Sequence, residues 1–514
     1  MTEVRGRVGI NATMLFVSGL ICKVVGALFR LPLTNVLGVE AIGVFQLTMS
    51  LFSFALVLSS GGATIALSRM VASLRAKGEH VKIGVCFRRA MMQTVCFAVV
   101  LGVLFAILWK KISTFQHILP NKSYLLFVIL LPLGASMSVF RGYFQGQENM
   151  VPTTVSQILE QVTKFVLGLF LAMVFGRQGM QQGVFGAFVG ITLSELVTVL
   201  VLFVWYFKKR KKNVYYSKDL QLSVLRKEYD KSNLLLTLSA ISLPLANMID
   251  GFLIVGRLQK AGMSASRATT LFGVQSGIVG TMLNLPLSIS VAVATACLPN
   301  FSFLLSKEKQ VGGAIEKGLK MLLFFVLPTT FGLVAIAPVL YVVVYPTVSY
   351  EMLTVAANLT LYGGFATVFT ALMQYAIMLL QAKGEFRFVA VLTAVASVAK
   401  VVLTVALAGV SFVNVYALVV GNLVFSGVVC VVALAKLKRC FDFKIPFLQI
   451  SNLILATAIM YISVSAFLKS GSLLPVLALV GAVLIGVLVY FLISAPFVVK
   501  NFLPHGEKEI VSNV

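Results

Sequence analysis

Seven ionisable side chains lie inside long apolar stretches of this sequence. A charge at the centre of a lipid bilayer costs several kcal/mol, so such residues usually face a cavity or pair with one another. They are therefore the first candidates for a substrate or ion site. The seven are Lys23, Arg30, Glu160, Lys164, Glu195, Asp250 and Lys400.

Lys23 and Arg30 share the first apolar stretch and are seven residues apart, about two helical turns. They therefore lie on one helix face, and no acidic residue of the same helix neutralises them. Such a cationic wall suits an anion that carries phosphate. Two alternatives remain: the pair is neutralised by Asp250 or Glu195 on other helices, or Arg30 reaches the membrane surface.

Glu160 and Lys164 are spaced i, i+4, so the spacing predicts that they neutralise each other. Asp250 is the only acid of its stretch. It either binds a coupling proton or cation, or pairs with a cavity lysine or arginine. Arg257, two turns further on, shares its face near the outer rim. The predicted cavity residues are Lys23, Arg30, Lys164, Asp250, Arg257 and Lys400. The predicted ion-coupling residues are Asp250, Glu195 and Glu160.

The segment RGYFQGQENMVPTTVSQ (141–157) is rich in Gly and Gln. Arg141 stands at a predicted helix end, and Pro152 suits the first turn of the next helix. The segment predicts a short cytoplasmic loop with Arg141 and Gln145 as candidate functional residues. The alternative is a tight turn without further function.

The amino-acid composition indicates that these residues belong to a membrane protein. Of the 514 residues 59% are hydrophobic and 11% are charged, and the mean hydropathy is +0.98. A soluble chain of this length cannot cover that much apolar surface. The numbers exclude a soluble enzyme, a disordered chain and a collagen-like chain. They indicate an all-α polytopic membrane protein.

About fourteen stretches are long and apolar enough to span a bilayer as helices. The eighth contains Pro286 and Pro299, which predicts a kink or break. The approximate limits are 9–33, 41–67, 84–109, 123–143, 152–176, 183–207, 234–256, 270–303, 318–345, 354–381, 387–409, 412–435, 449–468 and 473–497.

Basic residues set the expected orientation. The chain has 42 Lys and Arg against 17 Asp and Glu, a net charge of +25. On a soluble protein this excess would suggest nucleic acid, but lysines and arginines collect in cytoplasmic loops of membrane proteins. Thirty of the 42 fall in segments on the side of the N-terminus and eight on the other side. We therefore expect cytoplasmic termini and no nucleic-acid partner.

Cysteine and histidine give no sign of a metal or redox site. The six Cys form no C-x-x-C pair, and the three His are scattered. No nucleophile–base arrangement stands out. We therefore expect no metal, no cofactor and no enzymatic activity.

The two halves of the sequence resemble each other. YFQGQE (143–148) and LLQAKG (379–384) are 236 residues apart, and the same offset relates Lys164 to Lys400. Each half holds six predicted spans, which predicts parallel repeats that rock around a central cavity. We expect an N-terminal lobe (1–207), a basic cytoplasmic linker (208–233), a C-terminal lobe (234–440), and two further helices with a short tail (441–514).

Three segments carry a resemblance to a known family. RGYFQGQENMVPTTVSQILEQ (141–161) resembles the signature loop of the stage V sporulation protein B group of polysaccharide exporters. FRLPLTNVLGVEAIGVFQ (29–46) and SSGGATIALSRMVA (59–72) are similar to the first two spans of that group. The group belongs to the superfamily of multidrug, oligosaccharidyl-lipid and polysaccharide exporters and is related to lipid II flippases. The resemblance is most specific in residues 1–170.

The resemblance implies two six-helix lobes plus two helices that form a groove for a lipid tail. It implies a cavity lined by basic residues of the first span, which Lys23 and Arg30 match, although Lys23 departs from an all-arginine pattern. It also implies the bacterial cytoplasmic membrane as location. The implied partners are a lipid-linked oligosaccharide pyrophosphate, the bilayer and cell-wall synthesis enzymes.

The function expected from residues and resemblance together is a flippase. It would move an undecaprenyl-pyrophosphate-linked cell-wall or polysaccharide precursor by alternating access. The alternative is an ion-coupled exporter of cationic drugs, whose cavity would be acidic or aromatic.

Overall fold

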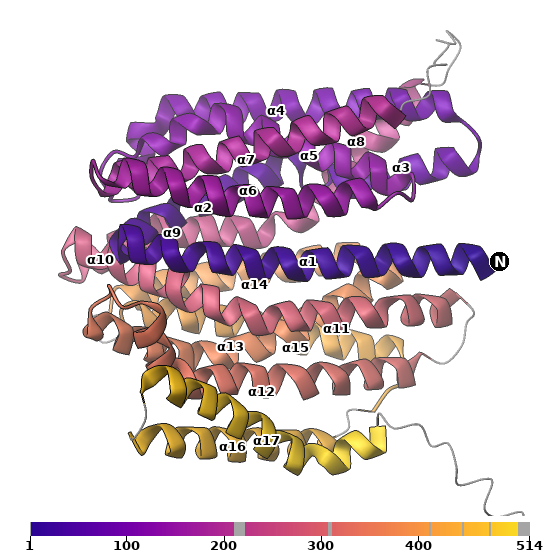
Figure 1. Ribbon diagram of the computed structural model, residues 1–514. Helices are drawn as coiled ribbons and strands as arrows, with labels where there is room; N and C mark the ends of the chain where they lie inside the picture. Colours follow the sequence, from indigo (N-terminus) through magenta and orange to yellow (C-terminus); the bar gives the residue numbers. More distant parts are fainter. Residues whose placement is uncertain are drawn as a thin grey trace, which may run out of the picture.

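The molecule is a stack of long helices that lie side by side (Figure 1). The structure is a computed structural model that describes residues 2–209, 222–306, 311–410, 413–444, 447–471 and 474–501. Within these ranges the regular structure is helical and contains no strand. This agrees with the predicted all-α class.

The helices follow the predicted spans in order. The first half contains α1 (Thr2–Leu37), α2 (Val39–Ser60), α3 (Ala63–Ala76), α4 (His80–Phe115), η1 (Lys122–Leu126), α5 (Phe127–Gly146), α6 (Val151–Gly176), α7 (Met180–Lys209) and α8 (Leu222–Ala240). The second half contains α9 (Ser242–Lys260), α10 (Ala265–Gly273), η2 (Val274–Val279), α11 (Gly280–Ser306), α12 (Gly312–Val344), α13 (Tyr350–Lys383), α14 (Phe386–Ala408), α15 (Tyr416–Cys440), α16 (Phe447–Lys469) and α17 (Pro475–Asn501).

These helices make the chain a multi-pass membrane protein. Twelve spans among the described residues are long and apolar enough to cross a bilayer, and α8 with α9 adds a thirteenth if the bent pair is one span. The 36-residue α1 is not in this count, because its apolar part, Val24–Leu37, is shorter than the other spans. The predicted count of fourteen is therefore approximate, although every predicted range overlaps, within the described residues, with a helix or with consecutive helices.

The break in the helices lies in the seventh predicted span. α8 and α9 meet at an angle of 47°. Pro244 lies in the first turn of α9 and has no N–H to donate to the carbonyl of Ala240, so a single straight helix would lose that bond. By contrast, α11 runs from Gly280 to Ser306 through Pro286, and the eighth span is irregular at the π-helical turn η2 instead.

Helix packing brings the two halves together around α1 and α9. In Figure 1, α1 runs between the helices of the first half and those of the second. It contacts α6 on one side and α11 on the other, while α9 contacts α2 and α14. α16 and α17 pack on each other and on α12, at the edge of the molecule. The predicted division into lobes at 208–233 and 440 stays a prediction, and α8 begins inside the predicted linker.

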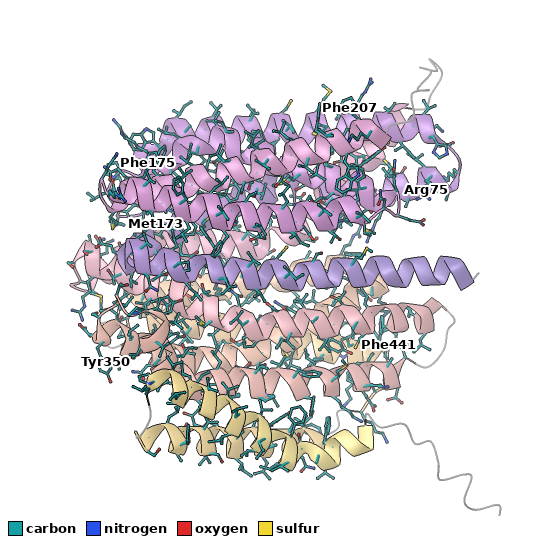
Figure 2. All side chains as sticks on the ribbon, in the orientation of Figure 1. Arg75, Met173, Phe175, Phe207, Tyr350 and Phe441 are labelled. Carbon is teal, nitrogen blue, oxygen red and sulfur yellow. The ribbon has the colours of Figure 1, made fainter. Side chains whose placement is uncertain are left out.

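The outer surface is apolar, as expected for helices that face lipid. Side chains cover the outside of the stack in Figure 2, where Met173 and Phe207 are labelled. Both are exposed, as are Val100, Val395 and Leu484 on other helices. A soluble protein rarely exposes so much contiguous apolar surface.

We predict that Gly190→Ala destabilises the fold. A methyl group at this position of α7 would collide with the backbone of Gly168 on α6. Overpacking of this kind costs about 1–3 kcal/mol, so the thermal midpoint in detergent should fall. Gly84→Ala is the matched control, because a methyl group there meets open space. Equal midpoints for the two variants would contradict close packing at Gly190.

Candidate substrate cavity

Two adjoining cavities lie where the halves meet. The larger cavity, about 540 Å³, lies between α1, α2, α9, α11, α13, α14 and α15. The smaller cavity, about 230 Å³, lies between α1, α2, α6 and α11. Arg30, Met49 and Asn284 line both, so the two spaces meet at these side chains.

Arg30 stands between the two cavities. One guanidinium nitrogen donates a long hydrogen bond of 3.4 Å to Thr281 Oγ1 on α11. Among the described residues, Arg30 has no carboxylate partner, so its charge is not compensated. Lys23, predicted on the same face, lies outside the residues whose side chains the structure describes.

Lys164 on α6 lines the smaller cavity. The predicted neutralisation of Lys164 by Glu160 is wrong, because the Glu160 carboxylate pairs with Arg141 of α5 at 2.7 Å. Lys164 has no ion pair among the described residues. The smaller cavity therefore holds two cations, Arg30 and Lys164, that form no ion pair with a described carboxylate.

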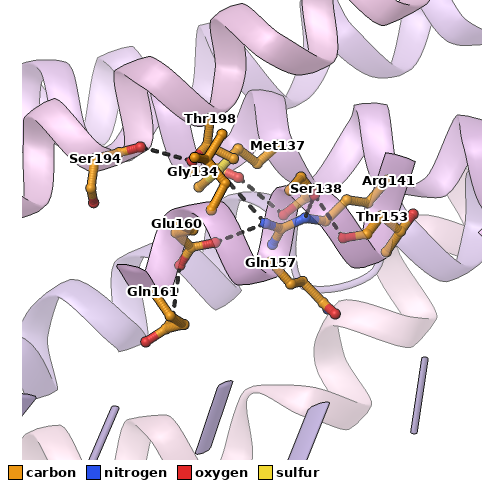
Figure 3. A network of polar contacts seen from close by, with 12 residues as sticks. Gly134, Met137, Ser138, Arg141, Thr153, Gln157, Glu160, Gln161, Ser194 and Thr198 are labelled. Atoms are coloured by element: carbon orange, nitrogen blue, oxygen red, sulfur yellow. Dashed lines mark hydrogen bonds and ion pairs between the residues drawn. The ribbon is translucent and has the colours of Figure 1, made fainter. Parts of the chain in front are cut away.

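Arg141 joins α5 to α6 (Figure 3). Its Nε donates to Ser156 Oγ at 3.1 Å, a second guanidinium nitrogen binds Glu160, and Gln161 Nε2 donates to the same carboxylate at 3.3 Å. These contacts explain why Glu160 is not available to Lys164. The network stabilises the contact between the two helices.

Arg141 is helical, as predicted, but the helix continues past it and includes Gln145, which corrects the predicted loop over 141–157. α5 continues to Gly146, and α6 begins at Val151. A methyl group at Gly142 or Gly146 would collide with α3, so the glycines allow α3 and α5 to pack closely and the helix to continue. Gln145 is partly buried and lines neither cavity.

Glu195 lies buried on α7, close to Gly134 of α5. Its Oε2 has no hydrogen-bond partner among the described residues. The charged side chains that act on it are Glu160, Lys164 and Arg141. Glu195 and Glu160 line neither cavity, and their predicted ion-coupling role stays a prediction.

Asp250 forms a buried ion pair with Lys400. Asp250 Oδ2 lies 2.9 Å from Lys400 Nζ, and the two side chains are 5% and 1% exposed. Lys400 Nζ also donates to Asn247 Oδ1 at 2.7 Å, so one lysine of α14 binds two side chains of α9. Of the alternatives left open by the sequence, the structure has Asp250 paired with a cavity lysine and not with Arg30.

Arg257 does not join the cavity residues. It is exposed in the last turn of α9 and lines neither space. Although it lies on the face of Asp250, the helix carries it beyond the end of the cavity. Arg30, Lys164, Asp250 and Lys400 are thus the predicted residues that the fold brings together.

Sequence reasoning missed the neutral polar side chains of the larger cavity. Reasoning from charge alone overlooks Asn and Gln inside apolar stretches, and these residues were the available signal. The amides that line the larger cavity are Gln46, Asn247, Gln275, Asn284, Gln374 and Asn422.

No metal-binding group occurs in the described ranges. No three His, Cys, Asp or Glu side chains there come close enough to hold an ion together. The chemistry that the cavities offer is therefore binding by cations, amides and hydroxyls.

Known proteins resemble this chain in sequence. The model of the family described as "Polysaccharide biosynthesis protein" matches residues 8–305. Stage V sporulation protein B of Bacillus subtilis is 27% identical over 311 residues, which are 58% of this chain and 58% of that relative. Lipid II flippase MurJ of Bacillus subtilis is 23% identical over 415 residues, 75% of each chain.

Solved structures share the fold. A lipid II flippase MurJ in an inward closed conformation superposes with a TM-score of 0.72 at 14% identity, covering 95% of this chain and 99% of the other. A multidrug resistance MATE family transporter of the MOP superfamily, inward-facing, gives a TM-score of 0.64 at 14% identity, covering 80% and 93%. At this identity the likeness concerns the fold alone.

We predict that removing one partner of the buried pair costs far more stability than removing both. Asp250→Asn leaves the Lys400 charge buried, which costs about 3–5 kcal/mol. The double variant Asp250→Asn, Lys400→Met should recover most of that loss. A double-mutant cycle on thermal midpoints in detergent measures the coupling.

The exposed pair Arg267–Glu351, at 2.7 Å, is the control. Glu351→Gln should cost about 1 kcal/mol or less, because water screens this pair. Additive losses at Asp250 and Lys400 would contradict a buried ion pair.

Proposed function

The chain belongs to the polysaccharide biosynthesis protein family, and from this premise we propose that it is a lipid flippase. It moves a pyrophosphate-linked glycan on a polyprenyl lipid across the bacterial cytoplasmic membrane. The observation that carries the proposal is a cavity inside a membrane protein lined by two cations, Arg30 and Lys164, that form no ion pair with a described carboxylate.

The charges of the cavities match such a substrate. The charged lining residues are Arg30, Lys164, Lys400 and Asp250, three cations and one carboxylate. A pyrophosphate diester carries roughly two negative charges, which Arg and Lys bind through charge-assisted hydrogen bonds. Binding would therefore leave the enclosed site close to neutral.

Contacts between the halves support alternating access. At one end, Asn35 Nδ2 donates to the Val344 carbonyl at 2.8 Å, and Ser266 donates to Glu40 at 2.6 Å. At the other end, the Arg69 guanidinium lies 5.2 Å from the centre of the Phe386 ring. Opening one set of contacts at a time would expose the cavity to one side of the membrane.

Two further arguments support the substrate class and the orientation. One relative of similar length is named a lipid II flippase. The excess of basic residues on the side of the N-terminus favours cytoplasmic termini. Cell-wall synthesis enzymes, as the source or users of the glycan, are the partners that this activity needs.

Export of cationic drugs is less well supported. A cation needs a free carboxylate or an aromatic cage. Asp250 is the one carboxylate among the described lining residues of the two cavities, and Lys400 already neutralises it.

We predict that the double variant Arg30→Gln, Lys164→Gln flips its substrate at least about tenfold more slowly than the wild type. Each of the two cations makes a charge-assisted contact with the pyrophosphate, and the variant lacks both. The measurement is translocation of fluorescent lipid II and of undecaprenyl-pyrophosphoryl N-acetylglucosamine in proteoliposomes. Arg257→Gln is the control, since Arg257 lies outside the cavities. Wild-type rates in a folded double variant would refute the proposal, and so would transport of a cationic dye alone.

A further inference from the structure

The two cavities differ in charge, although they share Arg30. The smaller one is lined by Arg30 and Lys164 and by no described carboxylate. In the larger one the remaining charges, Asp250 and Lys400, neutralise each other at 2.9 Å. Amides and hydroxyls supply the rest of its polar lining. The larger cavity is therefore polar but offers no second site for an anion.

Three acceptors in the larger cavity lack a donor. Gln275 Oε1, Gln374 Oε1 and Asp250 Oδ1 are buried and have no hydrogen-bond partner among the described residues. They come from η2, α13 and α9, three separate elements that face one space. A buried acceptor without a donor is unfavourable, so the lining favours a ligand rich in O–H or N–H groups.

The backbone around Gln275 is adapted to this position. Gln275 lies in the π-helical turn η2, where Gly280 N–H donates to the Gln275 carbonyl instead of to the residue one α-turn back. The neighbouring Ser276 carbonyl accepts from Gln46 Nε2 at 3.3 Å. Single π-turns in a helix often occur at functional sites, because they turn a side chain towards a ligand.

Apolar surfaces complete the lining. Phe272 and Phe425 line the same space as the three acceptors. A sugar ring presents C–H faces above and below and hydroxyls at its rim, which this mixture of aromatic and polar groups complements. The volume of about 540 Å³ lies within the range of ligand cavities, about 300–1,000 Å³.

We propose that the larger cavity is a binding site for an uncharged sugar attached to the pyrophosphate, and that Gln275 and Gln374 determine this specificity. The inference rests on the proposed function, because a pyrophosphate at Arg30 and Lys164 places its first sugar at the shared boundary. An acidic sugar is disfavoured, since its carboxylate would face acceptors and the free oxygen of Asp250.

The test compares three probes that share one farnesyl chain and a pyrophosphate diester. They are farnesyl methyl pyrophosphate, which has no sugar, farnesyl-pyrophosphoryl N-acetylglucosamine, and farnesyl-pyrophosphoryl glucuronic acid. Isothermal titration calorimetry gives Kd for the full-length protein in detergent. The methyl diester tests the anion site, and the two sugars test the inference.

On the wild type we expect the N-acetylglucosamine probe to bind at least about tenfold more tightly than the methyl diester, and the glucuronic acid probe to gain nothing. Gln275→Leu or Gln374→Leu should raise the Kd of the N-acetylglucosamine probe about five- to tenfold. The Kd of the methyl diester should stay within about twofold of its wild-type value. Gln93→Leu is the matched control, because its Oε1 also lacks a partner but faces neither cavity.

Distinct results overturn the two proposals. Binding of the methyl diester without any gain from N-acetylglucosamine overturns the sugar site and leaves the anion site standing. An equal gain from glucuronic acid overturns the selection for uncharged sugars. Failure of all three probes on the wild type overturns the flippase proposal, and the sugar site with it. The wild-type comparison holds even if a variant fails to fold.

Discussion

The ion pair between Lys400 and Asp250 determines which charges of the cavity remain available. In a membrane interior a buried cation needs a partner, and Lys400 has two, Asp250 and Asn247. Both lie on α9, so the pair also joins α9 to α14. Arg30 lines the same cavity and forms no ion pair with a described carboxylate. The charged residues that line the smaller cavity are Arg30 and Lys164, so that cavity is cationic.

The ion pair between Arg141 and Glu160 likewise determines which charges of the smaller cavity remain available. Arg141 binds Glu160, which leaves Lys164 without its helical neighbour as a partner. Lys164 and Lys400 are 236 residues apart, the offset of the predicted repeat. Lys164 lines the smaller cavity and forms no ion pair with a described carboxylate, while Lys400 is neutralised by Asp250 in the larger cavity. The two lysines thus have different electrostatic environments.

Close packing of the helices depends on small residues. Gly142 and Gly146 bring α3 against α5, and Gly190 brings α7 against α6. Gly62 N–H donates to Thr237 at 2.9 Å, which fixes the last turn of α8, next to the bend, against the start of α3. After the bend between Ala240 and Ser242, α9 packs on α14. The position of Asp250 relative to Lys400 depends on these backbone contacts.

The sequence by itself determined the all-α class, the approximate number and order of spans, and the cavity residues Arg30, Lys164, Asp250 and Lys400. These follow from hydrophobic runs longer than a bilayer requires and from the cost of charge in lipid, both of which are local properties. Only the tertiary structure decided the partners. Glu160 binds Arg141 instead of Lys164, Asp250 binds Lys400, and Arg257 lies outside the cavities.

The position of the helix break and the uncharged side chains of the larger cavity were also decided by the tertiary structure. Pro286 and Pro299 suggested a break in the eighth span, but α11 is continuous there and the sharp bend lies between α8 and α9, close to Pro244. Gln275 and Gln374 are amides inside apolar stretches, a local signal that reasoning from charge alone overlooks. Which residues far apart in the chain face one cavity depends on helix packing, and a single sequence does not contain that information.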